Sequence, residues 1–237
     1  MDEAVELWTY LARDPLLWLT VTLLAYVTAE RLSDLAGRHP LANPVLIAVI
    51  LLSALLLVTR TPYPTYFEGA QFVHFMLGPA TVALALPLFD NLTRVRRTLL
   101  PMAAALLAGS LTAILSAVGL AWIFGVRGET LLSIAPKSAT APVALGVSEA
   151  IGGQPSLTAV LVILTGITGA VMATPMLNAL GIRDWRARGF AVGVAAHGIG
   201  TAHAFRVNST AGAFAGIGMG LNAVLTAVLA PLIVALL

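Results

Sequence analysis

Lys137 is the only lysine in the chain, and it lies in an apolar segment between Pro136 and Pro142. An ammonium group inside a membrane segment is costly unless an anion, water or carbonyl groups surround it. Ser138 and Thr140, followed by Pro142, resemble a helix start with a capping hydroxyl and a proline in the first turn. The free amides and positive end of such a helix would face the same place as the lysine. These residues together predict a carboxylate site.

The alternative for this stretch is an ordinary loop, with the Lys137 side chain extended to the lipid headgroups, as often happens near helix ends. We favour the anion site because ionisable residues within membrane segments are functional candidates by default. Ser138, Thr140 or Thr201 would then form hydrogen bonds with the hydroxyl groups of a bound substrate.

A second polar group interrupts another apolar segment, where His197 and His203 flank Gly198, Gly200 and Thr201. The glycines allow the backbone to leave helical geometry or to approach a ligand closely. Imidazole titrates near neutral pH, so either histidine is a candidate to bind a carboxylate or to carry the proton of a coupled cycle. Each histidine fits a hydrogen-bonded place in the protein core equally well.

These residue types do not favour metal or covalent chemistry. The chain has no cysteine, and two histidines six residues apart without a neighbouring carboxylate are not a zinc or iron ligand set. Ser138 has no nucleophile elbow and no recognisable acid partner. We therefore expect no metal, no cofactor and no catalytic residue, and we expect that the protein is not an enzyme.

Four further residues are secondary candidates. Gly78 predicts a break in a helix, with His74 before it and Thr81 after it, although a simple proline kink would explain the same pattern. Glu149 precedes two glycines that should end a helix. For this glutamate a structural role at a helix end is favoured over an arginine partner or a proton acceptor.

The composition places these residues in a membrane. Of 237 residues, 59% are hydrophobic and 10% are charged, whereas soluble domains carry about a quarter charged residues. A net charge of +2 indicates no nucleic-acid partner. Spanning the hydrocarbon takes roughly 20 apolar residues as a helix, because backbone amides in lipid must be satisfied within the segment. The sequence predicts an all-α polytopic membrane protein with a single transmembrane domain over residues 1–237.

The elements that would position the candidate residues are eight apolar segments. Five are uninterrupted, and these are Leu16 to Ala29, Leu41 to Val58, Leu99 to Val126, Leu157 to Leu180 and Ala211 to Leu237. Three are interrupted near their middle by glycine, proline or an ionisable residue, and these are Gln71 to Phe89, Thr130 to Ser148 and Gly189 to Phe205. Irregular backbone at membrane depth lines a cavity or a binding site. We therefore expect seven to eight membrane segments with broken or re-entrant helices.

The distribution of arginines favours a topology in which Thr130 to Ser148 enters the membrane and returns to the same face. The arginine-rich loops then lie together and the amino terminus lies outside. These loops hold Arg31, Arg38, Arg94, Arg96, Arg97, Arg183, Arg186 and Arg188. A weak internal repeat aligns Ala80 to Leu86 with Ala139 to Leu145, as in transporters with duplicated halves. Glycine-rich helix faces, such as Gly212 to Gly220, lead us to expect a homodimer.

Several motifs resemble the LrgB/CidB family over nearly the whole chain. They are Ala135 to Pro142, Val147 to Gly153, Ala196 to Thr201, Leu77 to Thr81 and Gly212 to Phe214. Where relatives often have a second threonine this chain has Ala141, and where many have arginine it has His203. The first departure removes one possible hydroxyl ligand, and the second replaces a permanent charge with a titratable one. The substrate of a single relative is therefore not assigned to this protein.

The resemblance implies a location in the bacterial inner membrane and a small companion subunit of the LrgA/CidA type. It also implies a substrate such as glycolate, glycerate, pyruvate or lactate, since plant relatives include the plastidial glycolate/glycerate translocator. Other members are labelled holin-like or antiholin-like regulators of murein hydrolase export and lysis. We expect a transporter of small organic anions working by alternating access, with proton coupling through histidine. The alternative is a holin-like or antiholin-like protein.

Overall fold

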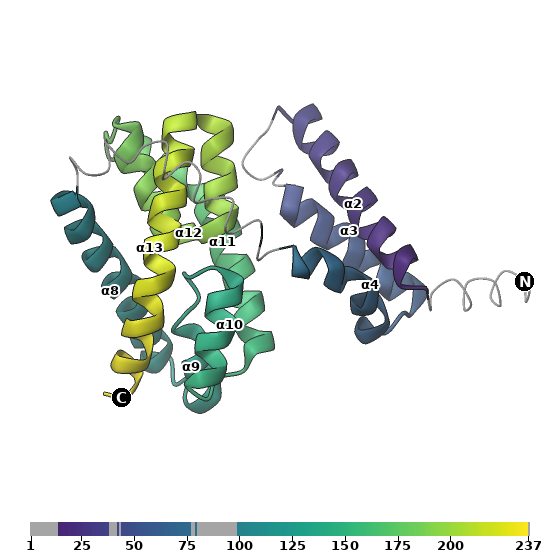
Figure 1. Ribbon diagram of the computed structural model, residues 1–237, viewed down its shortest axis with the longest axis horizontal. Helices are drawn as coiled ribbons and strands as arrows, with labels where there is room; N and C mark the ends of the chain where they lie inside the picture. The colour runs from purple at the N-terminus through teal and green to yellow at the C-terminus, as the bar shows by residue number, and fades with distance from the viewer. Residues whose placement is uncertain (1–13, 38–41, 43, 77–78, 80–98, 237) are drawn as a thin grey trace, which may run out of the picture. The chain divides into compact units, whose positions relative to one another are not determined.

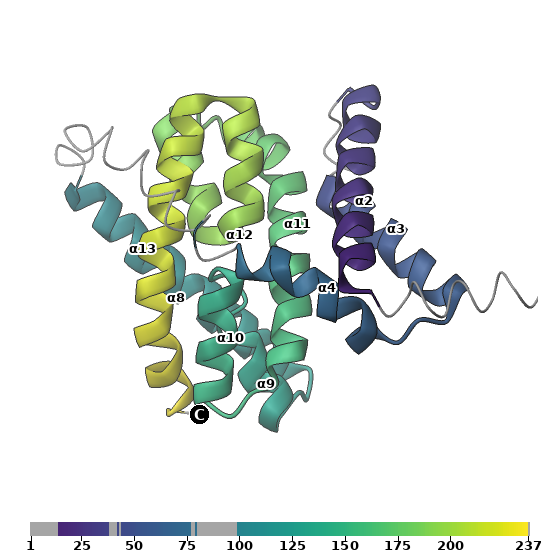
Figure 2. The same cartoon turned by 45° about the vertical axis from the view of Figure 1, so that its right-hand side comes forward.

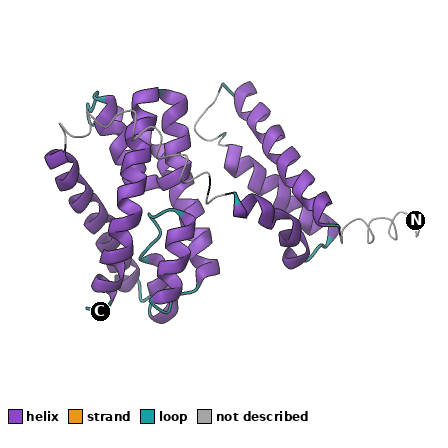
Figure 3. Ribbon diagram, in the orientation of Figure 1, coloured by secondary structure: helices purple, strands orange, loops and turns teal. Residues whose placement is uncertain are grey.

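The computed structural model describes residues 14–37, 42, 44–76, 79 and 99–236. All regular secondary structure in this part of the chain is helical (Figure 3). The chain divides into two compact units, residues 1–80 and 81–237. The all-α prediction is confirmed for the described residues, and the prediction of a single transmembrane domain stays a prediction.

The first unit contains α2 (Pro15–Leu35), α3 (Pro44–Thr59) and α4 (Tyr63–Phe75) (Figure 1). Asp14 begins α2, because its side chain accepts a hydrogen bond from the Leu16 amide at 2.9 Å. Trp18 is fully buried and meets the Tyr66 ring edge-on, with 5.8 Å between ring centroids. Gly69 permits this close packing of α2 on α4, since a Cβ there would lie 2.8 Å from the Trp18 Cβ.

The described residues of the second unit form six helices. They are α8 (Leu99–Ile123), α9 (Gly128–Ile134), α10 (Ala141–Ala150), α11 (Pro155–Ala179), α12 (Trp185–Val207) and α13 (Ser209–Val234). Four helices of the described residues, α2, α8, α11 and α13, are long and apolar enough to cross a membrane. The molecule is therefore a helical membrane protein with several spans, and the number of seven to eight segments stays a prediction.

The chain reverses direction between α9 and α10. Ser133 near the end of α9 faces residues that follow α10, because its Oγ accepts from the Gln154 amide at 2.7 Å. The Thr158 hydroxyl lies 3.0 Å from the Ser133 carbonyl and 2.7 Å from the Ser148 Oγ. The break expected within Thr130 to Ser148 thus falls at residues 135–140, between two antiparallel short helices. We call α9, this loop and α10 hairpin A.

A second reversal lies inside α12, at His197, whose φ of 40° and ψ of −136° are not helical. A Cβ on Gly200 would lie 2.9 Å from the Val192 Cγ1. Eight residues of continuous helix would separate these two positions by about 12 Å, so the chain after His197 runs back along the chain before it. We call the two halves of α12 hairpin B.

Hairpin B corrects one sequence expectation. The topology favoured from the arginines groups Arg188 with other arginines and leaves Arg206 out, which requires Gly189 to Phe205 to cross the membrane between them. In the structure His203 and Val207 line the same small hollow as Trp185 and Arg188, so both ends of α12 lie together. The physical reason is that the break turns the helix back on itself, which glycine content alone does not predict.

The first half of α12 packs tightly along the start of α13. Gly189 and Gly193 face the carbonyls of Ala211 and Ala215, and a Cβ on Gly218 would lie 2.6 Å from the Phe190 carbonyl oxygen. Small residues at these positions allow two helix backbones to approach closely. Part of the glycine-rich face of α13 thus packs against α12 of the same chain, and the homodimer expected from this face stays a prediction.

Asn208 separates α12 from α13, and its Oδ1 accepts from the amides of Thr210 and Ala211 at 2.9 and 3.1 Å. Asn208→Ala removes this cap and is expected to lower the free energy of unfolding by about 1 kcal/mol. Thermal unfolding in detergent measures the loss. Asn208→Asp keeps an accepting oxygen and is the control. Equal stability of the two variants would contradict a capping role.

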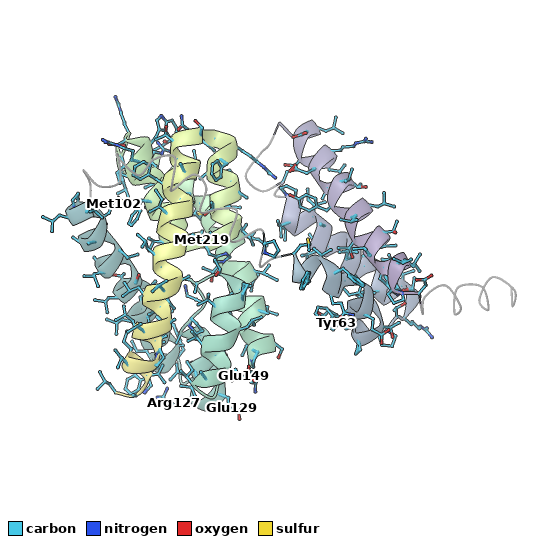
Figure 4. The ribbon with its side chains drawn as sticks, in the orientation of Figure 1. Tyr63, Met102, Arg127, Glu129, Glu149 and Met219 are labelled. Atoms are coloured by element: carbon cyan, nitrogen blue, oxygen red, sulfur yellow. The ribbon has the colours of Figure 1, made fainter. Side chains whose placement is uncertain are left out.

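Two parts of the second unit have the same order of elements. The helices α8 and α11 are both 25 residues long, and each is followed by a hairpin. Since α8 ends and α11 begins at the same end of the unit, hairpins A and B enter from opposite ends. Figure 4 shows Arg127, Glu129 and Glu149 gathered at the end from which hairpin A enters. The sequence repeat expected at Ala80 to Leu86 lies outside the described residues.

Candidate functional site

The tips of both hairpins meet the middle of α13. The Asn222 Nδ2 donates to the Ser138 carbonyl in hairpin A at 3.0 Å, and the Thr201 hydroxyl of hairpin B lies 3.9 Å from the Met219 Sδ. Met219 and Asn222 are one turn apart on one face of α13, and Met219 lies midway along the helix in Figure 4. The candidate residues of two distant segments are thereby brought to one place.

The helix α11 contacts both tips as well. His197 at the tip of hairpin B lies with its Nε2 2.8 Å from the Val162 carbonyl, and because a carbonyl only accepts, this nitrogen carries the hydrogen. Ala139 and Ala144 of hairpin A pack against the Val162 side chain. Gly166 leaves room for the imidazole. Figures 1 and 2 show α10 of hairpin A beside both α11 and α13.

Lys137 is half-buried at the tip of hairpin A, and its Nζ lies 3.3 Å from the Ser138 Oγ. Among the described residues, no carboxylate lies within ion-pair distance of Lys137. The site therefore holds a cation without a counter-ion among the described residues, which favours an anionic ligand.

The amino terminus of α10 adds to this positive site. Thr140 occupies the N-cap position and Pro142 lies in the first turn, as the sequence predicted. The Thr140 side chain, however, makes no capping hydrogen bond, which differs from the sequence expectation. The first amides of α10 are therefore not satisfied by this hydroxyl, and the positive end of the helix stays available to an anion.

The backbone strain in hairpin B falls on a candidate residue. Gly198 and Gly200 were expected to be the residues that leave helical geometry, but the positive φ is at His197. Positive φ is unfavourable for a residue with a Cβ and is typical of functional sites. Gly200 instead allows the two halves of α12 to touch, and Thr201 donates to the His197 carbonyl at 2.8 Å.

A buried polar network supports the site, and the sequence analysis missed it. The Ser110 hydroxyl donates to the Asn222 Oδ1 at 2.6 Å, and the Thr226 hydroxyl lies 3.4 Å from the same oxygen. These three side chains are each 1% exposed. The sequence does contain a signal for this network, because Asn222 is the lone amide side chain in the apolar segment Ala211 to Leu237. Polar side chains in membrane spans usually form hydrogen bonds to another helix.

Asn222→Leu leaves the Ser138 carbonyl and the Ser110 hydroxyl without this partner. We expect it to lower the free energy of unfolding by about 1 to 3 kcal/mol. We also expect weaker ligand binding, because the tip of hairpin A loses its hydrogen bond to α13. Denaturation and ligand titration of the purified protein measure both effects. Thr226→Val removes only the long contact, and an effect as large as that of Asn222→Leu would contradict the network.

The structure does not bring every candidate to the tips. His203 lies at the end of hairpin B with Arg188 and Trp185, and its buried Nε2 has no hydrogen-bond partner among the described residues. Glu149 is exposed at the far end of α10, since a ten-residue helix is about 15 Å long. Their predicted roles stay predictions.

The candidates of the third broken segment are not part of the described site. Gly78 and Thr81 lie outside the described residues, as does most of Gln71 to Phe89. His74 belongs to the backbone of α4, and its side chain is not described. In the part of the chain that the structure describes, no three histidine, aspartate or glutamate side chains gather as a metal site.

Fold and site together define a class of protein: a helical membrane protein with two oppositely entering hairpins that meet at a polar, cationic point. The chain belongs to the LrgB-like family, whose model matches residues 22–236. The predicted resemblance to the LrgB/CidB family is thereby confirmed.

The chain is similar to bacterial proteins along almost its whole length. It is 32% identical over 220 residues to "Holin-like protein CidB" of Staphylococcus epidermidis, covering 93% of this chain and 96% of that one. It is 30% identical over 221 residues to the protein of the same name from Staphylococcus aureus, with the same coverage. It is 35% identical over 216 residues to "Uncharacterized protein YxaC" of Bacillus subtilis, covering 90% and 93%. No solved structure matches the chain.

The names of the staphylococcal relatives agree with the holin-like alternative of the sequence analysis better than with a carboxylate transporter. They also agree with a bacterial membrane protein. The substrate and the companion subunit stay predictions.

Proposed function

We propose that this protein is a carrier of small organic anions such as glycolate, glycerate or pyruvate. The observation that carries the proposal is the meeting of two opposed hairpins at mid-span around Lys137, a cation with no carboxylate partner among the described residues. Secondary transporters commonly bind their substrates at such a point, between inverted repeats with discontinuous helices. Alternating access then moves one repeat against the other.

In this proposal hairpins A and B are re-entrant in the bilayer. Trp122 and Trp185 lie at opposite ends of the second unit and are each at least partly exposed, as expected of residues at the two membrane surfaces. Arg183, Arg186, Arg188 and Arg206 lie at the Trp185 end, while the other end carries Arg127. The positive-inside rule favours the Trp185 end as the cytoplasmic one. We propose the bacterial inner membrane as the location.

The substrate carboxylate would bind the Lys137 ammonium and the first amides of α10. Substrate hydroxyls would meet Ser138 and Thr140, and His197 is placed to carry a coupled proton. No covalent step is required of any of these groups, so the protein is proposed not to be an enzyme and to need no cofactor.

A holin-like or antiholin-like protein acting on murein hydrolase export and lysis is the second candidate. The names of the staphylococcal relatives favour it. In this case Lys137 and the hairpins would have no ligand, and the relevant partner would be a small membrane subunit of the LrgA/CidA type. A homodimer is compatible with either candidate.

Uptake of labelled glycolate, glycerate and pyruvate into liposomes that contain the purified protein distinguishes the two candidates. The assay is run with and without an inward proton gradient, and release of a trapped dye is measured in parallel. Saturable uptake of one acid without dye release is expected. Dye release, or no uptake of any acid with the companion subunit present, would favour the holin-like candidate.

A further inference from the structure

Arg188 is a buried cation at the end of the second unit where α11 ends and α12 begins. Its side chain is 8% exposed, and its Nη1 donates to the Asn178 Oδ1 at 2.8 Å and to the Ile182 carbonyl at 3.2 Å. The guanidinium lies over the Trp185 ring, 4.8 Å from its centroid. All these partners are neutral. A buried charge is costly without an opposite charge, so this position favours an anion.

The carboxylates that the structure describes in the second unit do not supply that charge. Asp184 accepts from the Arg186 Nη2 at 2.6 Å, and this hydrogen bond lowers the pKa of Asp184 to about 2, so that the pair is ionised and satisfied at neutral pH. The other two carboxylates of residues 99–236 are Glu129 and Glu149, which lie at the opposite end (Figure 4). Within the described residues, no carboxylate lies within 4.0 Å of an Arg188 nitrogen.

A cavity of about 240 Å³ adjoins this cation. It is lined by Asn178, Gly181, Ile182, Arg183 and Arg188. Drug-sized ligands occupy cavities of about 300 to 1,000 Å³, so the hollow suits a smaller group. Two guanidinium groups and one amide match the oxygens of a phosphate, which arginine binds through parallel hydrogen bonds.

We propose that the cavity between Arg183 and Arg188 binds a phosphate group, carried by an anionic phospholipid headgroup or free as inorganic phosphate. Trp185 beside the cavity is the residue type that lies at headgroup level in membranes. The site is at the end of α11, whereas the proposed carboxylate site is at the middle of α13. The two proposals are therefore independent.

Arg183→Gln tests the site, because Arg183 is exposed and lines the cavity. Arg186→Gln is the matched control, since it removes the same charge from the neighbouring turn without lining this cavity. One arm titrates inorganic phosphate into the purified full chain and follows the thermal unfolding midpoint. The other arm counts phosphatidylglycerol molecules retained by native mass spectrometry after exposure to mixed phosphatidylglycerol and phosphatidylcholine.

The native protein is expected to bind in one of the two arms, and the arm that responds identifies the source of the phosphate. In that arm, Arg183→Gln is expected to bind about tenfold more weakly, because the loss of one charge-assisted hydrogen bond weakens binding by about this factor. Arg186→Gln is expected to bind like the native protein. No binding in either arm, or equal binding by the two variants, would overturn the proposal. Arg188 would then serve only to bind carbonyls at the end of α11. Uptake of carboxylates by the same preparations reports on the carrier proposal separately.

Discussion

Lys137→Gln is expected to abolish carboxylate uptake while the protein still folds. The substitution removes the only lysine and leaves a side chain of similar length at the tip of hairpin A. Loss of one charge-assisted hydrogen bond weakens binding roughly 10- to 100-fold. Stability is expected to stay the same or to increase, because the substitution removes a half-buried charge that has no counter-ion in the described part of the chain. Binding is measured by titration and uptake in liposomes, and folding by thermal unfolding.

Arg127→Gln is the matched control for this experiment. It removes one positive charge from an exposed position at the end of the second unit, where Arg127 lies over the Trp122 ring and not at the hairpin tips. Uptake by this variant should equal that of the native protein. If Lys137→Gln binds and transports as well as Arg127→Gln, Lys137 does not bind the substrate.

Gly166→Ala is expected to have the second large effect, on both stability and uptake. A Cβ at this position would lie 2.6 Å from the His197 Cε1 and 2.9 Å from the Ile199 Cβ. The tip of hairpin B must then move away from α11, which breaks the hydrogen bond between His197 and the Val162 carbonyl. Overpacking of this kind costs about 1 to 3 kcal/mol. Chemical denaturation and liposome uptake measure the two losses.

Gly119→Ala provides the comparison, because Gly119 lies inside α8 and a Cβ there would meet no atom within 4 Å. Both substitutions put alanine into a long apolar helix, so they differ only in what surrounds the new methyl group. Unchanged uptake and stability in Gly166→Ala would show that the contact between hairpin B and α11 is not needed.

The candidate site was partly predictable because its signals are local. A lone lysine between prolines and two histidines beside glycines stand out in apolar segments, and the structure brings Lys137, Ser138, His197 and Thr201 to one place. His203 shares the same local signal, yet it lies at the end of hairpin B. Nothing in the five residues between the two histidines predicts this difference, which follows from the reversal of the chain at His197.

The supporting residues were not predictable in the same way. Asn222 contacts Ser138, 84 positions earlier in the sequence, and Ser110, 112 positions earlier. A polar side chain in a span indicates a contact with another helix but not which one. The partner depends on how α8, hairpin A and α13 pack together.

The sequence by itself determined that the chain is a helical membrane protein of the LrgB-like family and where its helices α8, α11 and α13 run. It did so because lipid requires every backbone amide to be satisfied within its own apolar segment, which is a local property. Only the tertiary structure decided that α12 doubles back and that both hairpins meet α11 and α13 at mid-span. The direction of the chain after a break is set by close packing of small residues such as Gly166 and Gly200 against distant backbone, and that packing exists only in the folded protein.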